Sequence, residues 1–305
     1  MEKTENKLKK KSVDFFPYTN VIGLSRSILA LGTLLTLLCN SKDVIVEKIN
    51  GNHFVNPALN QITFINKFNF FVIFGIDNYE YTRIVAIIIL AMVISGYFMK
   101  ITSILHWWVT LSFFLFSTII DGGDQITSIL TLLLIPICLT DRRKNHWSKI
   151  EKYESSNNLI AIVAIYLIRV QVAVVYLWAS MGKMMVEEWK NGTAIYYWVN
   201  HSFFGMPTYM SSFINYLLSN NFIVCSITYG VLILEILLFL GLTASVKYRK
   251  RILYIAILFH LSIIIFHGIF SFFFAMFGGL ILFLYPTYIN INFKSWKKET
   301  LLLFT

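Results

Sequence analysis

The stretch LIAIVAIYLIRVQVAVVYLWAS, residues 159–180, decides the fold class, because it is long and apolar enough to cross a lipid bilayer. A bilayer core requires about 20 consecutive apolar residues in a helix. The next stretch, MGKMMVEEW, residues 181–189, places a lysine, two glutamates and a tryptophan at the end of this predicted span. Lys183 is therefore either an anchor at the membrane edge or a group that carries chemistry.

The composition of the whole chain also indicates a membrane protein. Of its 305 residues, 57% are hydrophobic and 14% are charged, and the mean hydropathy is +0.66. Ordinary soluble domains carry about 25% charged residues. The net charge of +10 is typical of a membrane protein with basic loops. We expect the lipid bilayer as the surroundings of the protein and no nucleic-acid partner.

Apolar runs predict an all-α, polytopic transmembrane helix bundle with about eight spans. We interpret residues 1–18 as a basic cytoplasmic tail, residues 19–290 as the transmembrane domain and residues 291–305 as a second cytoplasmic tail. The predicted spans cover residues 21–39, 84–98, 101–119, 126–139, 159–180, 222–245, 252–267 and 270–288.

Basic residues predict how these spans are oriented. With eight spans, the segments KLKKK (7–11), DRRKNHWSKIEK (141–152), KYRKR (247–251) and KSWKK (294–298) all fall on one side. Cytoplasmic loops carry the excess of lysine and arginine, so both termini are predicted to be cytoplasmic. Lys183 would then lie at the outer end of its span.

Two interpretations of Lys183 remain open at this point. The lysine could extend its stem through lipid and keep its ammonium in the interface, or form an exposed pair with Glu187. Alternatively, the lysine faces the interior of the bundle and acts as a base or nucleophile. Tyr176 precedes it by seven residues, which places both on roughly the same helix face.

The turn DGGDQ, residues 121–125, is predicted to open on the same outer side as Lys183. Its aspartates could simply cap the following helix, because carboxylates are favourable at a helix N-terminus. In the functional interpretation Asp124 orients Lys183 or moves protons, and Gln125 positions a peptide backbone.

Three further polar residues lie inside predicted spans. Arg169 and Glu235 are each about 15 Å from the inner ends of neighbouring antiparallel spans. Equal depth and opposite charge predict an intramembrane ion pair between them. His260 is either a hydrogen-bonded bundle histidine or part of a proton relay with this pair.

The cysteines and histidines show no metal-binding pattern. Cys39, Cys138 and Cys225 form no closely spaced pair. Cys39 and Cys225 lie near the predicted outer ends of their spans, so a disulfide between them is allowed. We expect no metal and no cofactor.

Three blocks of the sequence resemble the SdpB family of sporulation-delaying-protein B homologues. They are PYTNVIGLSRSILALGTLLTLLCN (17–40), DGGDQITSILTLLLIPICLTDRRKNHW (121–147) and QVAVVYLWASMGKMMVEEWKNGTAIYYW (171–198). The resemblance covers most of the chain. It implies membership of the wider group of HTTM membrane proteins, which includes the vitamin K-dependent gamma-glutamyl carboxylase family.

The resemblance to the carboxylase family is weaker. Its order of Tyr, Ala, Lys, acidic residue, Trp and Gly is matched by Tyr176, Ala179, Lys183, Glu188, Trp189 and Gly192. Lys183 falls on the position of the proposed catalytic base of that family, but Gly182 replaces the preceding lysine. The large luminal domain of the carboxylases has no counterpart in this sequence. The resemblance therefore implies an active-site position and not vitamin K chemistry.

The SdpB resemblance implies maturation of an exported peptide toxin at the outer face of a bacterial plasma membrane. An SdpA-like protein is the implied partner, and an SdpC-like peptide precursor is the implied substrate. We expect peptide processing with Lys183 as base or nucleophile. Two other interpretations stay open: a non-enzymatic scaffold that presents the precursor, and a lipid- or quinone-dependent peptide-modifying enzyme of carboxylase type.

Overall fold

Long helices form almost all of the ordered structure. The computed structural model describes residues 16–46, 48–49, 52–53, 67–148, 157–202 and 204–292. In chain order the long helices are α2 (Asn20–Cys39), α6 (Tyr79–Ser95), α7 (Met99–Phe116), α8 (Gly122–Thr140), α9 (Asn157–Met184), α13 (Asn221–Leu240), α14 (Val246–His267) and α15 (Phe270–Leu284). The shorter elements are α3 (Lys42–Ile45), the hairpin β1 (Lys48–Ile49) and β2 (Asn52–His53), the 3₁₀ helix η1 (Ile76–Asn78), α10 (Glu187–Lys190), α11 (Ala194–Val199) and α12 (Thr208–Leu218).

The predicted all-α bundle is confirmed, and each predicted span corresponds to one long helix. Within the described residues, six helices could cross a membrane by length and composition: α2, α7, α8, α9, α13 and α14. Helix α15 is apolar but has only 15 residues, and α6 has 17 residues. The predicted tails fall largely outside the described residues, which begin at residue 16 and end at residue 292.

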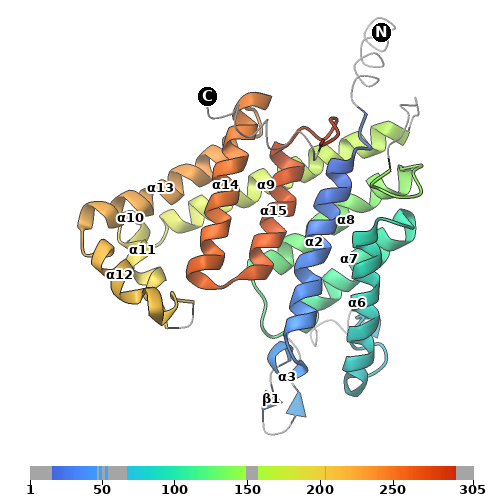
Figure 1. The fold of residues 1–305 in the computed structure, drawn as a ribbon, viewed down its shortest axis with the longest axis horizontal. Helices are drawn as coiled ribbons and strands as arrows, with labels where there is room; N and C mark the ends of the chain where they lie inside the picture. The colour runs from blue at the N-terminus through green and yellow to red at the C-terminus, as the bar shows by residue number, and fades with distance from the viewer. Residues whose placement is uncertain are drawn as a thin grey trace, which may run out of the picture.

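Helix α15 lies at the centre of the bundle and packs against α2, α8, α9 and α14 (Figure 1). Two adjacent glycines allow this close packing. A Cβ atom on Gly278 would lie 2.8 Å from Leu29 of α2, and one on Gly279 would lie 3.1 Å from Leu130 of α8. Small residues at such contacts let helix backbones approach closely in membrane proteins.

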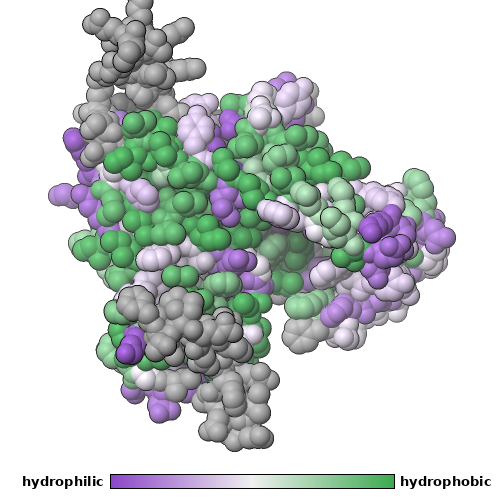
Figure 2. Space-filling model, turned by 180° about the vertical axis from the view of Figure 1, so that it is seen from behind, coloured by the Kyte–Doolittle hydropathy of each residue, from purple (hydrophilic) through white to green (hydrophobic). Residues whose placement is uncertain are grey.

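Helix α9 is longer than the hydrocarbon core of a bilayer is thick. Its 28 residues span about 42 Å, against about 30 Å for a hydrocarbon core. In Figure 1, α9 runs obliquely to the steeper α2, α14 and α15, and α13 runs obliquely beside α9. Figure 2 shows a broad hydrophobic surface, with hydrophilic residues gathered in the lobe formed by α10, α11 and α12.

Hydrogen bonds hold both described ends of the chain at one end of the bundle. The Thr19 hydroxyl donates to the Thr287 carbonyl over 2.7 Å. The Asn20 side chain donates to the Ile291 carbonyl and accepts from the Ile291 backbone N–H. Arg143, in the α8–α9 connection, donates to the Thr19 carbonyl and pairs with Asp141 at 2.7 Å. The basic segments 7–11 and 294–298 lie outside the described residues, so their placement on the cytoplasmic side stays a prediction.

The same α8–α9 connection closes the C-terminal end of α6. The Asn145 side chain donates to the Ser95 carbonyl, and the His146 backbone N–H donates to the Gly96 carbonyl. The His146 ring is buried against Gly23 and Gly96, where any side chain would collide with it. The histidine therefore acts as a wedge between α2 and α6.

Gly96→Ala is expected to destabilise the protein. Gly96 has a φ of 85°, and an added Cβ would lie 2.6 Å from His146 Cδ2. We expect a loss of about 2 kcal/mol or more in the free energy of unfolding. Thermal unfolding in detergent measures this loss. Gly230→Ala is the control, because its Cβ would meet open space. Equal unfolding temperatures for the two variants would contradict the wedge.

His146 is expected to make stability depend on pH. Burial, together with the nearby charges of Arg26 and Arg143, lowers the pKa of its imidazole from 6.5 to about 3. As pH falls below 6.5, the unfolded chain binds a proton that the folded chain refuses, so stability is lost. Between pH 7.5 and 5.5 this loss is about 1.4 kcal/mol. Unfolding curves of His146→Gln should lack this part of the pH dependence, and an unchanged dependence would contradict the assignment.

Candidate functional site

Lys183 of α9 forms an ion pair with Glu235 of α13. The Lys183 Nζ lies 2.6 Å from Glu235 Oε1. The glutamate side chain is 6% exposed and the lysine side chain 26% exposed. The ammonium also lies 5.4 Å from the centre of the Trp189 ring, in cation–π range. Lys183 thus faces a neighbouring helix and is not an anchor in lipid.

A second polar contact lies about two turns earlier on the same face of α9. The Tyr176 hydroxyl and His260 Nε2 of α14 are 2.9 Å apart, and both residues are buried. The His260 ring is also packed against Phe259 and against Phe272 of α15, with centroids 5.0 Å and 5.5 Å away. Tyr176 and Lys183 are seven residues apart, so α9 presents both on one face.

These two contacts belong to one cluster, which we call the Lys183 cluster: Tyr176, Lys183, Glu235 and His260. The charge of Lys183 acts on His260, and that of Glu235 acts on Tyr176. Three buried polar atoms around it have no hydrogen-bond partner: Ser180 Oγ, Glu235 Oε2 and His260 Nδ1. Unpartnered buried polar atoms are costly, so they point to polar groups of a ligand or water.

The segment after α9 folds back as a cover over the cluster. Trp189 of α10 is buried and packs with Ala194 of α11 and Leu232 of α13. The Tyr229 hydroxyl donates to the Lys190 carbonyl, which ties α10 to α13. Under this cover the Lys183 side chain stays partly exposed, whereas the Glu235 side chain is buried.

The predicted pair between Arg169 and Glu235 is not formed, because Glu235 binds Lys183. Arg169 Nη2 instead lies 3.4 Å from Thr287 Oγ1, at the end of the bundle where the chain termini meet. The prediction assumed upright helices. Arg169 and Lys183 lie about 21 Å apart along α9. Glu235 of α13 meets Lys183, whereas Arg169 lies near Thr287.

The turn before α8 adopts the capping arrangement. Asp121 accepts hydrogen bonds from the backbone N–H groups of Gly123 and Asp124, and Asp124 accepts one from the Asp121 N–H at 3.2 Å. Ser271 donates to Asp121. Gln125 is exposed. These contacts give Asp124 a structural task, while its suggested role toward Lys183 stays a prediction.

Sequence reasoning overlooked Arg26, a buried cation within α2. Its Nη2 donates to Thr102 Oγ1 at 2.6 Å, and its Nη1 has no partner. The signal was a single arginine within an apolar run. The three cysteines are unbonded, so the allowed disulfide is not formed. Among the described residues no group of acidic, histidine and cysteine side chains could hold a metal.

Comparison with known proteins finds two similar proteins of Bacillus subtilis (strain 168). The chain is 36% identical to the uncharacterized protein YitO over 294 residues, which cover 93% of this chain and 92% of YitO. It is 35% identical to sporulation-delaying protein SdpB over 283 residues, which cover 92% of this chain and 85% of SdpB. No family model matches the chain. No solved structure matches it either.

The ion pair is expected to show strong coupling in a double-mutant cycle. Lys183→Met leaves the buried Glu235 carboxylate unpaired, which should cost about 3 kcal/mol of folding free energy. Adding Glu235→Leu should return the stability to within about 1 kcal/mol of the original. Lys190→Met, at an exposed lysine of α10, is the control. Additive losses in unfolding experiments would show that the two side chains do not interact.

Proposed function

Because this chain belongs to the SdpB family, we propose that it is a membrane-embedded maturation factor for an exported antimicrobial peptide toxin. In this proposal an SdpC-like precursor is processed at the Lys183 cluster, and an SdpA-like protein is the partner. The processing takes place at the outer face of a bacterial plasma membrane. The observation that carries the proposal is the ion pair between Lys183 and the buried Glu235.

The free-energy cost of burying this ion pair supports a reactive site. Two charges taken out of water lose several kcal/mol of solvation each, on the order of what their attraction returns. A purely structural contact could be made by apolar side chains without that cost. Ionisable residues within membrane spans are accordingly functional-site candidates. The unpartnered Glu235 Oε2, Ser180 Oγ and His260 Nδ1 provide further polar atoms for a substrate.

We propose peptide-bond hydrolysis as the reaction, with one water consumed. Glu235 accepts a proton from the Lys183 ammonium, which frees the amine as a base. The amine takes a proton from water while the water oxygen attacks the peptide carbon. When the C–N bond breaks, Lys183 returns this proton to the departing nitrogen, so the products are one carboxyl group and one amine. Glu235 then returns its proton to Lys183.

Tyr176 and His260 have a positioning role in this mechanism. Their hydrogen bond fixes the tyrosine hydroxyl in the interior of the bundle, beside the glutamate. From there Tyr176 can hold the peptide backbone of the precursor, as its place beside the ion pair suggests. Asp124 and Gln125 are not needed for any step, because Asp124 caps α8 and Gln125 is exposed.

A second candidate function is a scaffold that presents the precursor to another protein. The exposed aromatic side chains of α12 favour it. Tyr209, Phe213 and Tyr216 are 82%, 65% and 76% exposed, respectively. Such side chains are enriched at protein interfaces, so α12 offers a surface for a peptide or a partner. In this function the Lys183 cluster contributes only stability.

Variants of the ion pair distinguish the two functions. Cells that produce the precursor and its partner are assayed for mature toxin by mass spectrometry, with the variant protein quantified in their membranes. Lys183→Ala and Lys183→Arg should lower mature toxin by about 100-fold or more, as expected on loss of a general base. Lys190→Ala should leave toxin production unchanged.

The double variant Lys183→Met/Glu235→Leu separates activity from stability. It is expected to fold but to make no mature toxin. Normal maturation by this variant, present at normal amounts in the membrane, would reject catalysis by the ion pair and leave the scaffold.

A further inference from the structure

Two buried arginines in the described part of the chain carry charges that the proposed function does not use. Arg169 of α9 is 7% exposed and Arg249 of α14 is 9% exposed. They are close enough for their positive charges to repel each other. Among the described residues neither forms an ion pair, and the Nε atom of each is buried without a hydrogen-bond partner. Burying two like charges is unfavourable unless an anion joins them.

More cations surround these arginines. Lys250 and Arg251 directly follow Arg249 in α14, and the Arg251 Nε is also buried without a hydrogen-bond partner. The Lys250 ammonium lies 5.3 Å from the centre of the Tyr285 ring. The described part of this region therefore offers guanidinium and ammonium donors with no carboxylate to balance them. Guanidinium groups suit the geometry of phosphate oxygens.

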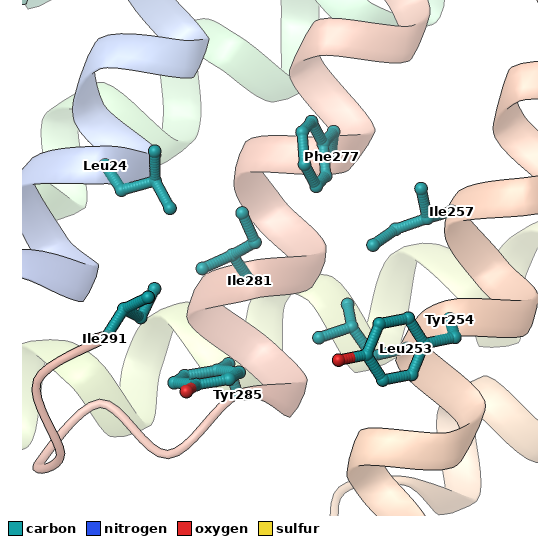
Figure 3. A pocket seen from close by; sticks show the side chains of 8 residues that line it. All are labelled: Leu24, Leu253, Tyr254, Ile257, Phe277, Ile281, Tyr285 and Ile291. Atoms are coloured by element: carbon teal, nitrogen blue, oxygen red, sulfur yellow. The ribbon is translucent and has the colours of Figure 1, made fainter. Parts of the chain in front are cut away.

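An apolar groove begins beside this cationic group. It is narrow, with a cavity volume of about 20 Å³, and is lined by α2, α14, α15 and the segment after α15. Its lining is apolar apart from the hydroxyls of Tyr254 and Tyr285. In Figure 3 Phe277 and Ile281 of α15, and Tyr285 just after it, lie between the side chains of α14 and Leu24 of α2. Tyr285, which Lys250 contacts, lines the groove, so charge and groove are continuous.

We propose that this region binds one anionic phospholipid. Its phosphate group lies at Arg169 and Arg249, and an acyl chain lies in the groove between α14 and α15. Two features favour a lipid over a free phosphate: the groove is apolar, and it belongs to helices that are long and apolar enough to sit in a bilayer. Basic pockets between transmembrane helices bind anionic headgroups in this way. This site lies near Thr287, away from the Lys183 cluster, and does not depend on the proposed toxin function.

The test measures thermal stabilisation of the delipidated protein in detergent. Phosphatidylglycerol, phosphatidylcholine and inorganic phosphate are added separately at matched concentrations. Phosphatidylglycerol is expected to raise the unfolding temperature, and the other two are not. Equal effects of the two lipids would overturn the proposal. If inorganic phosphate raised the unfolding temperature equally, the occupant would be a free phosphate and not a lipid.

Variants then locate the two parts of the site. Arg249→Gln should weaken phosphatidylglycerol binding by about ten-fold, as expected for a lost charge-assisted hydrogen bond. It should also raise the stability of the lipid-free protein, because it relieves the repulsion from Arg169. A merely structural arginine would lower that stability. Lys247→Gln is the matched control, because Lys247 is exposed in the same helical turn.

Filling the groove tests the acyl-chain part without touching the charges. Ile257→Trp should weaken phosphatidylglycerol binding, whereas Ile255→Trp, at an exposed position of α14, should not. This pair of variants still decides the question if Arg249→Gln fails to fold. Unchanged binding by folded Ile257→Trp and Arg249→Gln proteins would reject the site.

Discussion

The attraction between Lys183 and Glu235 is the interaction on which the account of this protein depends. Glutamate within an apolar helix is costly, and a lysine 2.6 Å away makes its charge tolerable. The pair joins α9 to α13 at a point that α10 and Trp189 cover. Tyr176 and His260 extend the same polar region to α14. A single ion pair thus organises the polar interior of one half of the bundle.

The fold brings these residues together through two geometric constraints. Gly278 and Gly279 let the central helix α15 approach α2 and α8 closely, so the helices around it are tightly placed. The length of α9 lets it connect both ends of the bundle. Arg169 reaches the basic end where the chain termini meet, and Lys183 reaches the covered region near α10. One helix thereby carries two cations into two separate environments.

The sequence was informative where a local property decides the outcome. Hydropathy predicted the helices, because lipid leaves the backbone few alternatives to a helix. The seven-residue spacing of Tyr176 and Lys183 correctly placed both on one face of α9 and left open whether that face is directed inward. The partner predicted for Glu235 was wrong. Helix tilt depends on packing across the whole bundle, and the spacing of residues along the sequence does not reveal it. The cover that Trp189 forms and the packing of Phe272 against His260 also depend on contacts between segments that are distant in the sequence. The capping role of Asp124 was among the interpretations that the turn DGGD allowed.

The most direct measurement is site-specific photocrosslinking of the toxin precursor. A photoreactive side chain at position 182 would extend into open space next to Lys183, since no atom lies within 4 Å of a Cβ at Gly182. The same group at position 255 lies on the exposed face of α14. If the precursor is processed at the Lys183 cluster, it should be captured from position 182 and not from position 255. Capture from position 255 alone, or equal capture from both, would contradict the account.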